Sequence, residues 1–70
     1  MARTWMKEKR RELGITEKEA GEAIGISESY YCCIEAGVRQ KKMDLQLVSR
    51  LANLFQMTVD EIILTEAKTE

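Results

Sequence analysis

The stretch that decides the fold covers residues 16–37 and reads TEKEAGEAIGISESYYCCIEAG. Thr16 is followed three residues later by Glu19, the capping-box pattern in which each side chain bonds the other residue's backbone amide at a helix start. Ser27 is a second strong N-cap, and Gly37 is the residue type that commonly closes a helix. These signals predict two short helices. Their predicted ranges are 17–24 and 28–36.

The rest of the chain also reads as helical. Proline is absent, and apolar residues between 44 and 55 recur at spacings of three and four, the stripe of an amphipathic helix. Thr58 and Glu61 repeat the capping box. We therefore predict an all-α chain with one domain over 1–66 and a flexible tail over 67–70. The three further helices are expected at about 3–13, 44–55 and 59–66.

The composition narrows the classes of function. The chain has 70 residues and a formal net charge of −1, with 11 basic and 12 acidic residues. Histidine is absent and the two cysteines are adjacent, so the commonest general base and the spacing of a zinc site are both missing. No phosphate-binding or dinucleotide-binding glycine motif occurs. We expect no enzyme activity, no metal, no cofactor and no evident small-molecule ligand.

The same composition bears on location. No stretch approaches the roughly 20 apolar residues that a membrane span needs. The N-terminal MARTWMKEKRR lacks the apolar region of a signal peptide, and two adjacent cysteines are no disulfide framework. We therefore expect a cytoplasmic protein that has no membrane partner.

Helical spacing sorts the predicted helix 28–36 into faces. Tyr31 and Ile34 are three apart and form the natural inward pair. Ser29 and Cys33 are four apart and share another face, and Glu28 stands beside them. Two short helices joined by a glycine-containing turn are the pattern of a helix-turn-helix.

At this point the chain resembles the lambda repressor/Cro-like family of bacterial and phage regulators, also known as the xenobiotic-response-element family. The resemblance covers roughly residues 5–64 and implies a compact five-helix domain whose third helix enters the major groove of DNA. Its carriers are Arg10, GIT at 14–16, Glu19, Gly25–Ile26–Ser27, IEAG at 34–37, LVSRLANLF at 47–55 and TVDEI at 58–62.

The resemblance also implies site residues. Three positions on the third helix would face base edges: Glu28, Ser29 and Cys33. Six would approach the DNA backbone: Glu17, Tyr30, Arg39, Gln40, Lys41 and Lys42. Arg10 and Glu35 match a pair that joins the first helix to the third, which we interpret as structural.

Some residues have an ordinary interpretation beside the functional one. A contact with phosphate and simple partial burial explain Tyr30 equally well. The run Arg39, Lys41 and Lys42 is either a solvated charge run or a set of backbone contacts. Cys32 and Cys33 are most simply two small helix residues, and oxidation of Cys33 as a switch on DNA docking is the alternative.

We therefore expect a small bacterial or prophage repressor that binds double-stranded DNA at a palindromic operator as a homodimer. Ile63 and Leu64 are the residues expected at the dimer interface, because Ile62 should face inward. The alternative is an antitoxin-like or adaptor module for protein partners with weakened DNA binding, which Glu17 and Glu28 favour.

Overall fold

Five α-helices make up the secondary structure of the computed structural model, which describes residues 2–69. They are α1 (Thr4–Leu13), α2 (Glu17–Ala23), α3 (Glu28–Glu35), α4 (Leu45–Phe55) and α5 (Val59–Thr69). No strand occurs within the described residues. The all-α, five-helix architecture predicted from the sequence is therefore confirmed.

Side-chain caps fix the starts of four of the five helices, and the sequence predicted three of these caps, at Thr16, Ser27 and Thr58. The Glu19 amide donates to Thr16 Oγ1 over 3.1 Å, and the Thr16 amide donates to Glu19 Oε1 over 2.9 Å. The box at Thr58 and Glu61 is equally complete, with distances of 3.0 and 2.8 Å. Substituting such a cap by alanine costs about 1 kcal/mol. In a chain this small, four side-chain caps are a substantial part of what specifies the elements.

One core joins all five helices. Tyr31, Ile34 and Ile62 are fully buried, so the inward faces predicted for α3 and α5 are confirmed. Phe55 is buried, and half-buried Trp5 packs against it edge-on with ring centroids 5.9 Å apart. The full set of buried apolar residues is Met6, Ala20, Ile24, Tyr31, Ile34, Leu47, Val48, Leu51, Ala52, Phe55 and Ile62.

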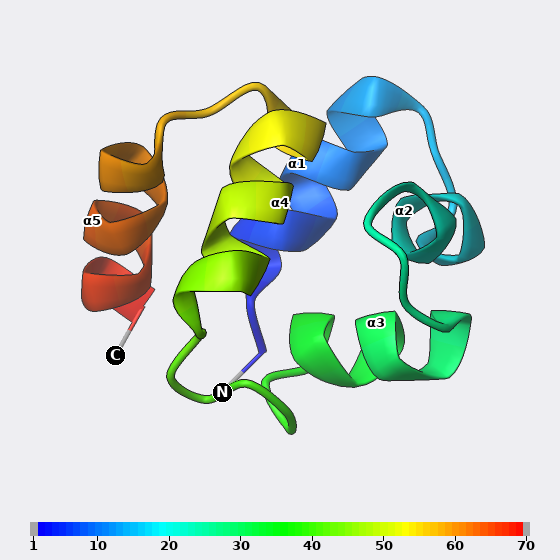
Figure 1. Ribbon diagram of the computed structural model, residues 1–70, viewed down its shortest axis with the longest axis horizontal. Helices are drawn as coiled ribbons and strands as arrows, with labels where there is room; N and C mark the ends of the chain where they lie inside the picture. The colour runs from blue at the N-terminus through cyan, green and yellow to red at the C-terminus, as the bar shows by residue number, and fades with distance from the viewer. Residues whose placement is uncertain (1, 70) are drawn as a thin grey trace.

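The helices that are neighbours in the sequence at 17–35 lie far from the last helix (Figure 1). Figure 1 shows α2 and α3 at one end of the molecule and α5 at the other, beyond α4. The connection between α3 and α4 runs along the same edge of this view as α3, and the N-terminal segment ends beside that connection (Figure 1). The segment before α1 is thus close to the loop that follows α3.

The end of α5 differs from the expected boundary. The helix continues through Thr69, so residues 67–69 of the expected tail are helical, and Glu70 lies outside the described residues. The sequence after residue 66 contains no glycine or proline that would stop a helix.

Candidate nucleic-acid interface

The unit formed by α2, the turn 24–27 and α3 is so closely packed that one position needs a glycine. A Cβ atom at Gly21 would lie 3.1 Å from the carbonyl oxygen of Ile26 and 3.2 Å from that of Ser27. The Ile26 amide donates a 2.9 Å hydrogen bond to the Gly21 carbonyl. Gly25 turns the chain with a φ of +78°, which glycine adopts without strain. The turn therefore lies directly on α2 and fixes the direction of α3.

The outer face of α3 is polar and accessible. Glu28 and Ser29 are exposed, as is Cys32, whereas Cys33 is half-buried. Together with the burial of the inward pair, this places the three predicted base-reading positions on the side of α3 that faces away from the core. Their roles toward DNA stay a prediction.

Glu17 at the start of α2 acts on a cysteine of α3. Its carboxylate raises the pKa of the Cys32 thiol, and desolvation adds a smaller effect in the same direction. Both cysteines are free thiols. Because reactive cysteines have lowered pKa values in electropositive surroundings, Cys32 lacks the environment of a redox-sensitive thiol.

Positive charge is concentrated immediately after α3, in residues 38–42, which we name the basic loop. Arg39, Lys41 and Lys42 are exposed, and no ion pair joins them to a carboxylate of the described side chains. α3 itself contains no basic residue, so the positive charge beside its outer face comes from the segment that follows it.

The Gln40 side chain connects Tyr30, another predicted backbone-contacting residue, to the start of α4. Its Nε2 donates to the Tyr30 hydroxyl over 2.8 Å and to Asp44 Oδ2 over 3.2 Å. Its Oε1 accepts from the Asp44 amide over 3.1 Å. Gln40 has a φ of +53°, an uncommon conformation for a residue with a side chain. These bonds hold the middle of the basic loop against α3 and the start of α4.

Arg10 and Glu35 form a two-pronged ion pair between α1 and α3. Arg10 Nε donates to Glu35 Oε2 over 3.1 Å and Nη2 to Oε1 over 3.2 Å. Arg10 Nη1 also donates to the Ile15 carbonyl over 3.0 Å. The hydrogen bonds to Glu35 raise the pKa of Arg10, and both side chains are largely buried. The geometry is that of structural scaffolding.

Arg3 is a residue that sequence reasoning missed. It is 4% exposed, and its guanidinium donates to the carbonyls of Ile34 (2.7 Å), Arg39 (3.1 Å) and Gln40. Its Nε forms an ion pair with Glu66 Oε1 at 2.8 Å. No sequence pattern could have identified it. Three of the four hydrogen bonds of its guanidinium go to backbone carbonyls that lie more than thirty positions away in the sequence.

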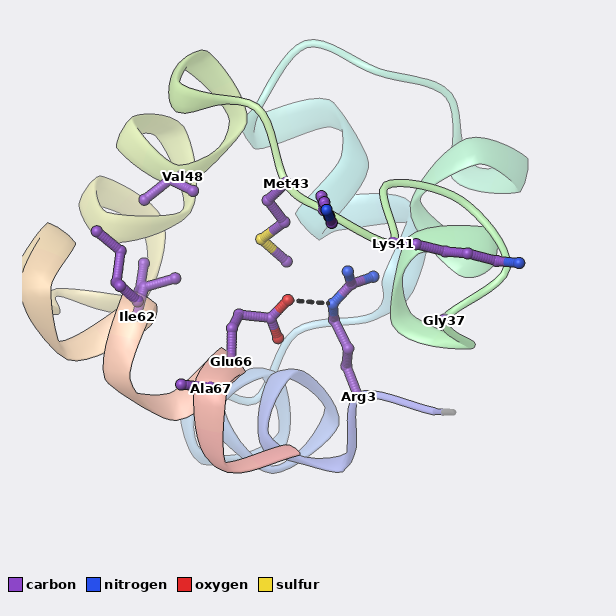
Figure 2. A pocket seen from close by; sticks show the side chains of 10 residues that line it. Arg3, Gly37, Lys41, Met43, Val48, Ile62, Glu66 and Ala67 are labelled. Atoms are coloured by element: carbon purple, nitrogen blue, oxygen red, sulfur yellow. Dashed lines mark hydrogen bonds and ion pairs between the residues drawn. The ribbon is translucent and has the colours of Figure 1, made fainter. Parts of the chain in front are cut away.

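A pocket of about 660 Å³ lies between the basic loop and α5. Met43, Val48 and Ile62 provide apolar lining, and Lys41 and Lys42 line the loop side. Figure 2 shows the Arg3–Glu66 ion pair between the loop and α5 in this region. The pair therefore bridges the loop and the last helix.

Comparison with known proteins decides the family. A family model described as helix-turn-helix matches residues 6–62. The chain belongs to the helix-turn-helix family. This confirms the resemblance to lambda repressor/Cro-like proteins.

One curated relative of this helix-turn-helix protein is the HTH-type transcriptional regulator YqaF of Bacillus subtilis (strain 168). The two are 42% identical over 40 residues, which is 57% of this chain and 53% of the relative. The chain thus spans about half the length of that relative. No solved structure matches.

The helix-turn-helix match has informative limits. It includes every residue that we predict to contact DNA, from Glu17 to Lys42, whereas Arg3 and Glu66 lie outside it. Within the described residues, none of the helices has the length and apolar character needed to cross a membrane. Nor do those residues contain a cluster of three or more metal-ligating side chains.

Proposed function

We propose that this helix-turn-helix protein is a sequence-specific regulator of transcription that binds double-stranded DNA. The observation that carries the proposal is the juxtaposition of the exposed outer face of α3 with the unpaired positive charges of the basic loop. The family match supports it, as does the relative's designation as a transcriptional regulator.

The proposed docking places α3 in the major groove and the basic loop on the sugar-phosphate backbone. Glu28 is suited to accept from a cytosine amino group, and Ser29 can bond several base edges. Cys33 lies beside them. Arg39, Lys41 and Lys42 would neutralise phosphates, which supplies most of the affinity.

Tyr30 and Glu17 would act in opposite ways on the DNA backbone. The Tyr30 hydroxyl accepts from Gln40, which leaves its own proton to donate to a phosphate oxygen. Glu17, at the start of α2, would approach the DNA backbone with a negative charge, and a carboxylate repels phosphate. We therefore expect it to disfavour backbone positions close to the start of α2 and so to contribute to register.

Selection of bound sites from random duplex DNA tests this function. The expected result is enrichment of a palindrome, because two-fold dimers bind half-sites about 34 Å apart. The selection is repeated with Arg39, Lys41 and Lys42 all changed to alanine, and this triple variant should bind all sequences more weakly. Failure to enrich any sequence would contradict the proposal.

The dimer and the repressor role are further parts of the proposal. Ile63 and Leu64 are 53% and 61% exposed on α5, and a neighbouring copy would bury them. Sedimentation at tens of micromolar should give a dimer, and Ile63→Lys with Leu64→Lys should give a monomer. Leu13→Lys, at an exposed leucine of α1, is the matched control and should leave the mass unchanged.

The second candidate function is a module that binds a protein partner. The acidic residues Glu17 and Glu28 beside the outer face of α3 favour it, because negative charge there opposes DNA. Titration of random duplex DNA at several salt concentrations separates the two functions. A steep fall of affinity with salt supports the DNA-binding regulator, and negligible binding at low salt supports the protein-interaction module.

A further inference from the structure

Arg3 holds backbone groups that belong to the proposed DNA-binding surface. Its guanidinium, which has five N–H donors, forms four hydrogen bonds. Three of these bonds go to backbone carbonyls. Two of those carbonyls are in the basic loop, at Arg39 and Gln40, and the third is in the last turn of α3, at Ile34. One rigid planar group therefore fixes the loop relative to the recognition helix.

The N-terminal backbone strengthens this connection. The Arg3 amide donates to the Glu35 carbonyl over 2.7 Å, next to the carbonyl that accepts from its side chain. The last carbonyls of a helix have no partner within the helix, and a cation there also suits the negative end of the helix dipole. Arg3 thus caps the end of α3 from outside the helix.

Glu66 of α5 compensates the buried charge. Arg3 is almost fully buried, and an uncompensated guanidinium in that environment would be strongly unfavourable. Glu66 provides the negative partner and is itself held by the Trp5 indole, whose Nε1 donates to Glu66 Oε2 over 2.7 Å. The position of the guanidinium is therefore defined from the loop side and from the α5 side.

Besides Arg3, a small number of hydrogen bonds define the shape of the basic loop. It forms no helix or strand, its three cations are exposed, and Gln40 at its centre adopts a left-handed conformation. Apart from Arg3, it is held by the Val38 and Arg39 amides, which donate to the Cys33 carbonyl over 2.9 and 3.2 Å, and by the side chain of Gln40 on Tyr30 and Asp44. Cations on a loop that moves must be ordered when they bind phosphate, and that ordering reduces affinity.

We propose that Arg3, held by Glu66, is a positioning residue that pre-organises the basic loop for contact with the DNA backbone. Arg3 does not touch DNA itself. The inference rests on the proposed function, because it concerns the conformation of the basic loop in the proposed DNA-binding surface. It also links α5 to DNA affinity, since the loop depends on a carboxylate of the last helix.

The test compares Arg3→Lys and Glu66→Gln with the unmodified chain. Lysine keeps the charge but loses the planar fork, and glutamine keeps an acceptor but loses the charge. The probe is a mixed-sequence DNA duplex of about thirty base pairs, roughly three helical turns. Both variants should bind roughly three- to tenfold more weakly, the equivalent of one or two phosphate contacts, and the salt slope should fall by about one.

A control removes the contribution of stability. Thr58→Ala removes the side-chain cap of α5 without touching the loop, so it lowers stability and leaves the loop contacts in place. All variants are titrated at a temperature at which circular dichroism shows them fully folded. Thr58→Ala should keep the affinity and the salt slope of the unmodified chain. If Arg3 contributed only to stability, Arg3→Lys would keep them as well.

A double-mutant cycle gives the decisive result. When Arg39, Lys41 and Lys42 are already alanine, Arg3→Lys should cost no further affinity, because its effect passes through those cations. An unchanged affinity of both Arg3→Lys and Glu66→Gln, or an equal loss with and without the loop cations, would overturn the inference alone. If the triple loop variant itself binds like the unmodified chain, the loop does not contact DNA. The proposed role of the loop and the inference would then fail together.

Discussion

Gly21 leaves little room for a side chain, because the atoms nearest its missing Cβ belong to the backbone of the turn. Those atoms, the carbonyl oxygens of Ile26 and Ser27, would be 3.1 and 3.2 Å away. A flexible side chain would rotate out of such a contact, whereas the turn, which is hydrogen-bonded to α2, can relieve it only by a shift of its backbone. The position therefore controls how α2 and α3 meet.

We expect Gly21→Ala to destabilise the protein by about 1–2 kcal/mol in urea unfolding. Alanine gains up to roughly 1 kcal/mol in helix propensity, but the overpacked contact costs about 1–3 kcal/mol. Lys18→Ala in the same helix is the control and should change stability by less than about 0.5 kcal/mol. A Gly21→Ala protein as stable as the control would mean that the turn shifts without cost.

The cysteines give a second residue-scale prediction. At neutral pH the raised pKa of Cys32 should make it react slowly with iodoacetamide, despite its exposure, because the thiolate is the reactive form. Glu17→Gln removes the main cause of the shift and should accelerate modification of Cys32, followed by mass spectrometry of the peptide. An equal rate in both proteins would contradict the assigned cause.

Which residues face the core could be predicted from helical spacing. Contacts of a side chain with backbone atoms could not be predicted from the sequence. Tyr31 and Ile34 face the core as their spacing predicts. The pairing of Arg10 with Glu35, expected from family resemblance, is present at hydrogen-bonding distance. The role of Arg3 was not predicted, because every residue type has a backbone carbonyl and the sequence therefore does not identify which carbonyls accept a hydrogen bond.

At the scale of elements, helix starts were easier to locate than helix ends. Thr16, Ser27, Asp44 and Thr58 each form a side-chain cap, and such caps require particular residue types. The ends depend on weaker signals. α5 passes the expected boundary and reaches Thr69, because the sequence after residue 66 contains no residue that breaks a helix.

The cap of α5 should weaken in acid. Hydrogen bonds from the backbone and side chain of Thr58 lower the pKa of Glu61 in the folded protein. A lowered folded pKa means that the stabilisation is present above the unfolded value of about 4.3 and is lost as pH falls through the folded value.

The measurement is urea unfolding between neutral pH and about pH 3. Glu61→Gln keeps an acceptor for the Thr58 amide but has no proton to take up. The stability difference between the unmodified chain and Glu61→Gln should therefore shrink as the pH falls below the range of free carboxylates. A difference that is constant over the whole range would exclude the carboxylate as the origin.

At the scale of the whole molecule, a largely buried ion pair joins α3 to α1. We expect Glu35→Ala to lower stability by about 3–5 kcal/mol, because it leaves the Arg10 guanidinium buried without its counter-charge. Replacing both residues, as in Arg10→Met with Glu35→Leu, should restore much of the loss. Urea unfolding of the three variants measures this, and a double variant less stable than Glu35→Ala would contradict the argument.

Charge shows what the sequence of a whole molecule can and cannot tell. The net charge of −1 gives no indication of nucleic-acid binding, because it averages acidic helices with the basic loop. The order of residues was more informative, since the loop directly follows α3 and must lie near it. How the loop is fastened was not predictable, because its fastening joins residues from both ends of the chain.

The dependence of the basic loop on carbonyl oxygens has a consequence for protein engineering. Arg3 recognises main-chain atoms that any amino acid provides, so the residues at 39, 41 and 42 can be exchanged without removing the groups that shape the loop. Gln40, whose side chain bonds Tyr30 and Asp44, should be kept. A library randomised at those three positions would vary surface chemistry on a constant backbone, which makes this loop a suitable starting point for designed binding.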